Sequence, residues 1–164
     1  MKGIGKTLTR RRKESKTDYK ARMGMLKSDV PRLVVRRSNR FIIAQIVSSE
    51  NAQDKILFEA SSKELLAHGW PANLMGSLKS LPAAYLTGIL IASKAKKNTV
   101  KKAILDMGMQ RNVAGGRVYA VLKGAVDGGL DVPHNKTILP DEKQLSKIQK
   151  THSLIHSLRA KLAG

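Results

Sequence analysis

The sequence predicts an α/β protein whose mixed sheet contains an antiparallel three-strand meander and is covered by helices. Between residues 31 and 60 the chain has three segments rich in β-branched and aromatic residues, joined by short links. After residue 60 the pattern changes to helix, strand and helix in turn, which implies a crossover back to the sheet. With 164 residues, 41% of them hydrophobic, the chain can form one core and leave about 20 to 30 residues for extensions.

The three strands of the meander are expected at residues 32–37, 40–48 and 55–60. The first two flank Ser38-Asn39, a two-residue link suited to a hairpin. In the third, Ile56, Phe58 and Ala60 alternate with the residues between them, as the side chains of a strand do.

The later elements are expected to be a short helix at 62–68, a longer helix at 82–96, a buried strand at 103–107 and a helix at about 117–129. Gly69 ends the first of these, and Pro82 suits the first turn of the second. Gly115-Gly116 precedes the last helix. This order of elements makes the sheet mixed, with helices packed on it.

The two ends of the chain differ from this core. Residues 1–16 show no periodicity, which is typical of an arm that becomes ordered only when it binds a partner. Residues 17–26 can form a short helix capped by Thr17 or Asp18. Beyond Pro140, an apolar stripe consists of Leu145, Ile148, Ile155, Leu158 and Leu162. That stripe docks either on the domain itself or on a neighbouring protein or RNA. We therefore expect a basic N-terminal arm with a short helix (1–30), an α/β core domain (31–136) and a C-terminal helical extension (137–164).

Positive charge is concentrated at the beginning of the chain. Fourteen of the 31 Lys and Arg residues lie in the first forty positions against three acidic residues, so this quarter carries +11 of the formal +19. Such a density suits a row of phosphates, and the leading hypothesis is nucleic-acid binding. Because aromatic residues make up only 4% of the chain, recognition of the backbone and shape of folded RNA, or of DNA, is favoured over stacking on many unpaired bases.

Several other classes of function are disfavoured. The chain has no cysteine and only four scattered histidines, so neither a metal site nor a cofactor is expected. Its longest apolar stretch, 81–92, is shorter than the roughly 20 residues that span a membrane. Backbone N–H groups of Gly108 and Gly115-Gly116 offer a weak alternative as a phosphate site, but no nucleotide-binding motif accompanies them. No membrane partner and no small-molecule substrate are expected.

A nuclease is the rival from another class. The predicted order of elements also occurs in ribonuclease H-like sandwiches, which is the arrangement we expect, but nucleases of that kind need clustered carboxylates to hold two metal ions. The first two strands contain no acidic residue, and Asp106 has no obvious companion in the sequence. We expect no catalytic residue and no enzymatic activity. A DNA-compacting protein is a third alternative, with the charge but without the motifs.

The candidate RNA-binding residues form three sets. In the arm they are Arg10, Arg11, Arg12, Lys13, Lys16 and Arg22, which would neutralise phosphates, together with Tyr19, which either stacks on a base or packs on the domain. On the hairpin they are Arg32, Arg36, Arg37, Asn39 and Arg40, whose rigid support would select a particular backbone shape. A possible second RNA contact consists of Lys94, Lys96, Lys97, Lys101 and Lys102, which otherwise are ordinary surface and capping residues.

A series of motifs follows in order along the chain. The opening motifs are Thr17–Tyr19, Leu26–Ser28, Pro31–Arg36, Ser38-Asn39 and Ala44–Val47. The later ones are Leu81–Gly88, Ala103–Asp106, Gly116–Asp127 and Gly129–Asn135. Together they resemble the archaeal and eukaryotic branch of the ribosomal protein L-eighteen family, whose eukaryotic member is called ribosomal protein L-five. Met109 and Gly128 depart from the family pattern, where Leu and Ala are expected. The C-terminal segment lacks the long extension of the eukaryotic branch, which favours an archaeal source.

The resemblance implies a cytoplasmic protein of the large ribosomal subunit. Proteins of this family bind 5S ribosomal RNA and attach it to the large-subunit 23S ribosomal RNA in the central protuberance. It also implies an α/β sandwich with a mixed sheet, and a neighbouring ribosomal protein of the L-five family.

Overall fold

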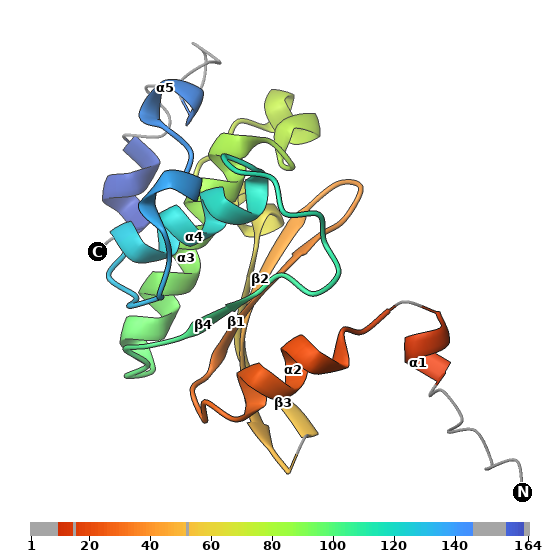
Figure 1. Ribbon diagram of the computed structural model, residues 1–164. Coiled ribbons are helices and arrows are strands. Elements are labelled where there is room, and N and C mark those ends of the chain that lie inside the picture. Colours follow the sequence, from red (N-terminus) through yellow and green to blue (C-terminus); the bar gives the residue numbers. More distant parts are fainter. Residues whose placement is uncertain (1–9, 15, 52, 146–156, 163–164) are drawn as a thin grey trace, which may run out of the picture.

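The computed structural model describes residues 10–14, 16–51, 53–145 and 157–162. Its centre is a four-stranded sheet with the order β3-β2-β1-β4 (Figure 1), formed by β1 (Arg32–Arg37), β2 (Ile42–Glu50), β3 (Gln53–Ser61) and β4 (Ile104–Asp106). The first three strands are antiparallel neighbours, and β4 returns parallel to β1. The predicted α/β class, with its meander and crossover, is confirmed. The finer ribonuclease H-like arrangement stays a prediction.

The connection between β1 and β2 is longer than the predicted two-residue link. The hydroxyl of Ser38 accepts hydrogen bonds from the N–H groups of Arg40 and Phe41, at 3.3 and 2.9 Å. The N–H of Ser38 donates to the carbonyl of Phe41. These local bonds replace the first ladder bonds of the second strand. The strand therefore begins at Ile42 and not at Arg40, and the prediction was wrong by two residues.

The predicted alternation in β3 also stops partway along the strand. The pairing of Ile46 with Phe58 is followed by that of Val47 with Ile56, so Leu57 is an extra residue at a β-bulge. Ile56 and Leu57 are both exposed, at 53% and 43%. The half of β3 before the bulge thus extends beyond the core.

Two helices, α3 (Leu81–Lys97) and α4 (Arg117–Asp127), pack on each other and on one face of the sheet. Their backbones meet at two glycines: a Cβ on Gly88 would lie 2.1 Å from the carbonyl oxygen of Val121, and one on Gly124 would lie 2.0 Å from that of Tyr85. Only glycine permits so close an approach.

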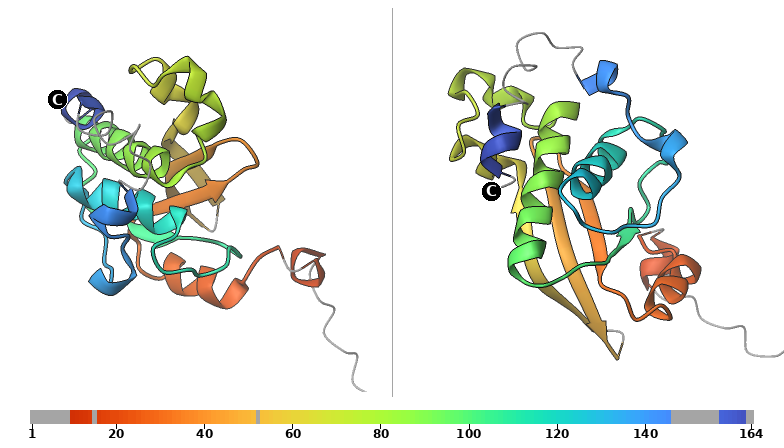
Figure 2. Two further views of the ribbon diagram at one scale, coloured as in Figure 1. Left: turned by 90° about the horizontal axis from the view of Figure 1, so that it is seen from above. Right: turned by 90° about the vertical axis from the view of Figure 1, so that its left-hand side faces the viewer.

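The core lies between these helices and the sheet. Leu33 and Val35 of β1 point into it, so the alternation of a strand places Arg32 and Arg36 on the opposite face. The helix α2 (Tyr19–Leu26) lies beside the sheet and away from α3 (Figure 2). It lines a cleft with Arg32 and Arg36 and so covers part of that opposite face.

The smaller elements refine the predicted pattern. The short helix expected at 62–68 is the 3-10 helix η1 (Ser62–Leu66), and η2 (Ala72–Ser77) and η3 (Lys136–Ile138) were not predicted. The arm, expected to lack regular structure before residue 17, contains the single turn α1 (Arg10–Lys13). The carboxylate of Asp18 accepts bonds from two N–H groups and caps α2, as one of the two expected caps.

The C-terminal stripe docks on the domain, which was the first of the two alternatives. Leu145, at the end of α5 (Glu142–Leu145), and Leu158 and Leu162 are buried in the main core. Ile148 and Ile155 lie outside the described residues.

Candidate nucleic-acid interface

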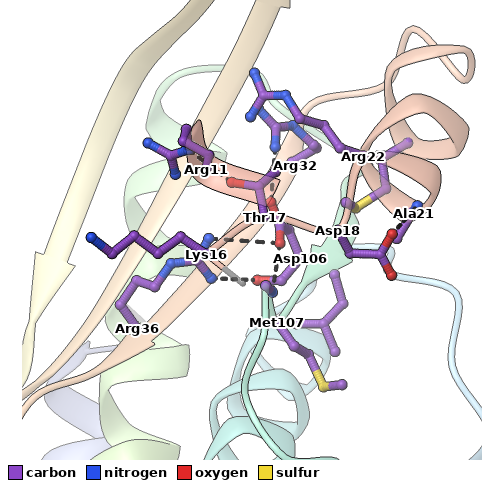
Figure 3. A pocket seen from close by; sticks show the side chains of 13 residues that line it. Arg11, Lys16, Thr17, Asp18, Ala21, Arg22, Arg32, Arg36, Asp106 and Met107 are labelled. Atoms are coloured by element: carbon purple, nitrogen blue, oxygen red, sulfur yellow. Dashed lines mark hydrogen bonds and ion pairs between the residues drawn. The ribbon is translucent and has the colours of Figure 1, made fainter. Parts of the chain in front are cut away.

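A cleft of about 260 Å³ opens between the arm and the edge of the sheet formed by β1 and β4 (Figure 3). We call it the arm cleft. Its lining residues are Arg11, Lys16, Thr17, Asp18, Ala21, Arg22, Met25, Arg32, Arg36, Leu105, Asp106, Met107 and Gly108. Segments about ninety residues apart thus meet in one site because the crossover returns β4 to the side of β1.

The floor of the arm cleft is a buried ion pair. Arg32 donates to the carboxylates of Asp106, at 2.8 Å, and Asp54, at 2.6 Å. Arg32 is only 3% exposed, and Asp106 is buried as well. The expectation that Arg32 offers its guanidinium to RNA is therefore not met in this structure: the strand turns it under α2, where two carboxylates engage it. The companions that Asp106 lacked in the sequence are arginines, not further carboxylates.

Asp54 links the floor to the arm. It accepts bonds from Arg22 of α2, at 3.0 Å, from Arg32 and from the hydroxyl of Ser49, at 2.7 Å. Burial by itself raises the pKa of this carboxyl, but the hydrogen bonds from Ser49, Arg22 and Arg32 outweigh burial and leave the pKa below its ordinary value. One carboxylate thus ties α2 to the sheet.

The rim of the arm cleft carries cations on one side. Figure 3 shows the side chains of Arg11, Lys16 and Arg36 extending on the same side of the cleft. Arg36 donates to the carbonyl oxygens of Val35 and Asp106, at 3.0 and 3.2 Å, while 46% of its side chain stays exposed. Its guanidinium also lies 3.7 Å from the carboxylate of Asp106, which already binds Arg32 more closely. These contacts orient the guanidinium and leave about half of the side chain accessible to a ligand.

Arg11 and Lys16 are held more loosely at the same rim. Arg11 donates to the hydroxyl of Thr17 at 2.8 Å, and Lys16 lies 2.7 Å from Glu14. Both cations are exposed, and ion pairs between exposed groups are weak. A phosphate can displace such contacts.

Arg10, Lys13 and Tyr19 are not among the described residues that line the cleft. Arg10 is exposed, with its guanidinium 4.0 Å from Glu14, and Lys13 is exposed too. The side chain of Arg12 is outside the described part of the structure, so its role stays a prediction. Tyr19 on α2 is 40% exposed, which leaves its ring accessible to a base.

The hairpin arginines do not form the single cluster that the sequence predicted. Because neighbouring side chains of a strand alternate, Arg36 faces the arm cleft whereas Arg37 lines a separate cleft near the start of α4. Arg40 and Asn39 line a third depression, beside Met75 and Lys79. Arg37 and Arg40 are exposed and, among the described residues, have no ion pair.

The predicted second lysine group is partly used within the protein. Lys94 donates to the carboxylate of Glu64 at 2.7 Å and to the carbonyl of Glu59 at 2.6 Å. The ammonium group of Lys102 lies 3.9 Å from Asp131. Lys96, Lys97 and Lys101 are exposed. The structural role that the sequence left open is thus established for Lys94.

The described residues offer no metal or nucleotide site of the kinds considered. In the described ranges no three His, Asp or Glu side chains are grouped to hold a metal ion. The weak alternative of a glycine phosphate site is wrong, because Gly108, Gly115 and Gly116 donate their N–H groups to Asp106, Ile138 and Val113. Within the same part of the chain, no helix has both the length and the apolar character needed to cross a membrane.

Fold and charge together define a small basic α/β protein whose cationic clefts suit a polyanion. The family model described as "Ribosomal large subunit proteins 60S L5, and 50S L18" matches residues 6–102 and 93–135. The chain belongs to this family.

Two relatives illustrate the similarity. The "Large ribosomal subunit protein uL18" of Korarchaeum cryptofilum is 51% identical over 143 residues, which cover 87% of this chain and 71% of the relative. The protein of the same name from Methanoculleus marisnigri is 53% identical over 136 residues, or 83% of this chain and 75% of the relative. These are names of ribosomal proteins, so the expectation that the protein is not an enzyme is confirmed.

Proposed function

We propose that the protein binds 5S ribosomal RNA through the arm cleft and attaches it to 23S ribosomal RNA in the central protuberance of the large subunit. One observation carries the proposal beyond family membership: Arg11, Lys16 and Arg36 extend on one side of a cleft whose carboxylates are already engaged. A row of cations with a compensated floor suits a phosphate backbone.

The two kinds of cation at the rim have different roles in this proposal. Arg11 and Lys16 are exposed and loosely held, so they contribute affinity that falls with salt. Arg36 is oriented by two backbone carbonyls, so its planar guanidinium selects RNA whose phosphates match that orientation. Arg32 does not touch the RNA. With Asp54 and Asp106 it holds α2 and β1 at the spacing that the backbone requires.

The division into an arm (1–30), a core (31–136) and a C-terminal extension (137–164) fits this mode of binding. The ion pair between Arg22 and Asp54 joins the helical part of the arm to the core, so part of the interface is formed before RNA arrives. The remaining partners in the proposal are neighbouring large-subunit proteins, including one of the L-five family.

The experiment is a comparison of 5S ribosomal RNA, transfer RNA and duplex DNA as ligands, across a salt titration at physiological magnesium. We expect selective binding of 5S RNA and, if about six phosphates are engaged, a log–log salt slope of about −5. The variant with Arg10, Arg11 and Arg12 replaced by Ala should bind all RNAs more weakly and flatten the slope. Equal binding to all three ligands, lost together as salt rises, would instead favour a nonspecific DNA-binding protein.

A further inference from the structure

A second cationic cleft, of about 120 Å³, lies where the loop after β4 meets the beginning of α4. We call it the α4 cleft. It is lined by Arg37, Gln110, Arg111, Val113, Gly116, Arg117, Val118 and Tyr119. Three of these eight residues are arginines, and no Asp or Glu is among them. The three arginines come from a strand, a loop and a helix, so only the tertiary structure brings them together.

None of the three arginines is neutralised within the described part of the chain, where Arg37, Arg111 and Arg117 have neither an ion pair nor a side-chain hydrogen bond. Like charges that share a cleft repel one another, and this repulsion is relieved when an anion binds between them. The α4 cleft is therefore arranged for a polyanion and not for a network inside the protein.

The loop that carries Arg111 is held on both sides of that residue. The side-chain N–H of Gln110 donates to the carbonyl of Val35 in β1 at 2.7 Å. The phenol of Tyr119 in α4 donates to the side-chain oxygen of Asn112 at 2.5 Å. Arg111 thus sits at a defined position even though it lies in a loop. A site whose backbone is already fixed loses less entropy when its ligand binds.

The beginning of α4 adds to the positive field of the cleft. Gly116 caps the helix without a side-chain hydrogen bond, and its first turn contains no acidic residue. Arg117 places a positive charge at the helix end that already carries partial positive charge, which is unfavourable unless an anion lies nearby. This arrangement agrees with the charge of the three arginines but does not by itself define a ligand.

We infer that the α4 cleft binds a backbone phosphate of a second RNA segment, the segment to which 5S ribosomal RNA is attached. The inference rests on the proposed function. It assigns the second contact to Arg37, Arg111 and Arg117 in place of the lysine group near the end of α3, where Lys94 is bound to Glu64. Guanidinium groups bind phosphate and carboxylate oxygens alike in a bidentate manner. Three unneutralised guanidinium groups in one cleft match the closely spaced charges of an RNA backbone better than an isolated carboxylate of a protein partner.

The test compares two triple variants that lose the same charge. One replaces the arginines of the cleft (R37Q, R111Q, R117Q), and the control replaces three exposed lysines that belong to no candidate RNA contact (K63Q, K136Q, K161Q). Each full-length protein is measured for binding to 5S ribosomal RNA, for capture of an archaeal 23S ribosomal RNA transcript by the preformed complex with 5S RNA, and for binding to the 23S transcript alone. Urea unfolding shows that each variant is folded. The single variant R111Q is measured in the same assays, because it removes only one arginine and changes the fold least.

We expect the arginine variant to bind 5S RNA within threefold of the unchanged protein and to capture 23S RNA at least tenfold more weakly. The lysine variant should keep both activities within threefold. The inference is overturned if the arginine variant captures 23S RNA normally, if both variants lose capture equally, or if the arginine variant loses 5S binding to the same extent. If the unchanged protein does not bind 5S RNA, the proposed function is refuted. The α4 cleft is then still tested by comparing how the unchanged protein and the arginine variant bind the 23S transcript alone.

Discussion

The arm cleft and the α4 cleft receive neighbouring residues of one strand, Arg36 and Arg37, yet they differ in how their positive charge is balanced. At the arm cleft, Arg32 and Arg36 meet Asp106, and Arg32 also meets Asp54. At the α4 cleft, no carboxylate is found among the described lining residues. Part of the charge in the first cleft therefore stabilises the fold, whereas the charge in the second is free for a ligand.

The two clefts also differ in what holds them open. The arm cleft depends on ion pairs between α2 and the sheet. The α4 cleft depends on a helix whose backbone packs directly on α3 at Gly88 and Gly124. An ion pair is broken by removing one of its two side chains, whereas a close contact between two backbones is broken by adding a side chain. Each cleft can therefore be disturbed by a different kind of substitution.

The largest effect is expected from Gly124→Leu, which disrupts the packing of α4 on α3 beneath the α4 cleft. A side chain there would begin 2.0 Å from the carbonyl oxygen of Tyr85, so the two helices must separate. We expect a loss of more than about 4 kcal/mol in the free energy of unfolding, measured with urea. Gly24→Ala is the matched control, because nothing lies within 4 Å of its added carbon, and it should stabilise α2 by roughly 0.5 to 1 kcal/mol. Equal unfolding midpoints for the two variants would contradict the role of the glycine contact.

The next largest effect is expected from Arg32→Met, which removes the ion pairs at the floor of the arm cleft. The change leaves the buried carboxylate of Asp106 without its main partner, at a cost of about 3 to 5 kcal/mol in the free energy of unfolding. The double variant with Asp106→Asn should recover part of this loss. Arg40→Met is the control: it removes an exposed arginine and should change stability by less than about 0.5 kcal/mol. If Arg32→Met is no worse than the control, the ion pair does not support the cleft.

A smaller effect separates the clefts by function. Arg36→Gln should reduce the preference for 5S ribosomal RNA over transfer RNA by about tenfold, or about 1.4 kcal/mol, because the oriented guanidinium of the arm cleft is lost. Arg37→Gln should leave this preference within about twofold, since its side chain lies in the other cleft. Competition binding at fixed salt measures both values. A larger effect of Arg37→Gln would reverse the assignment of the two clefts.

The smallest effect is the response of the arm cleft to acid. The pKa of Asp54 is lower in the folded protein than its ordinary value of 3.8, so its ionised form favours folding. That stabilisation is fully present above the ordinary value and is lost as the pH falls through the lowered pKa. Comparing urea unfolding at pH 6 with unfolding near pH 3 should show a smaller decrease for Asp54→Asn than for the unchanged protein. Parallel decreases would show that Asp54 contributes nothing to the acid response.

Much of the fold could be predicted because its signals are local. Alternation in residues 32–37 placed Arg32 and Arg36 on one face, and Pro82 and the final lysines marked the ends of α3. The errors arise from hydrogen bonds and strand pairing that the periodicity of the sequence does not show. The Ser38 hydroxyl reorganised the turn, and the bulge at Leu57 appears only when β3 is paired with β2.

The candidate site was predicted less completely. The charge of the arm and the family motifs indicated a ribosomal RNA-binding protein, and Arg11, Lys16 and Arg36 do line one cleft. Arg111 and Arg117 were missed, because neither lies in a charge run or a recognised pattern of cations.

The sequence by itself determined the α/β class, the family and the sign of the partner's charge, since these follow from periodicity, ordered motifs and composition. The tertiary structure alone decided which arginines form ion pairs within the protein and which face a ligand. Arg32 is buried because Asp106, 74 residues away, returns beside it through the crossover. In the described part of the chain, Arg37 has no ion pair, because its neighbours in the cleft include Arg111 and Arg117 but no carboxylate. The strength of a charge depends on its surroundings in space, which neighbours in the chain do not specify.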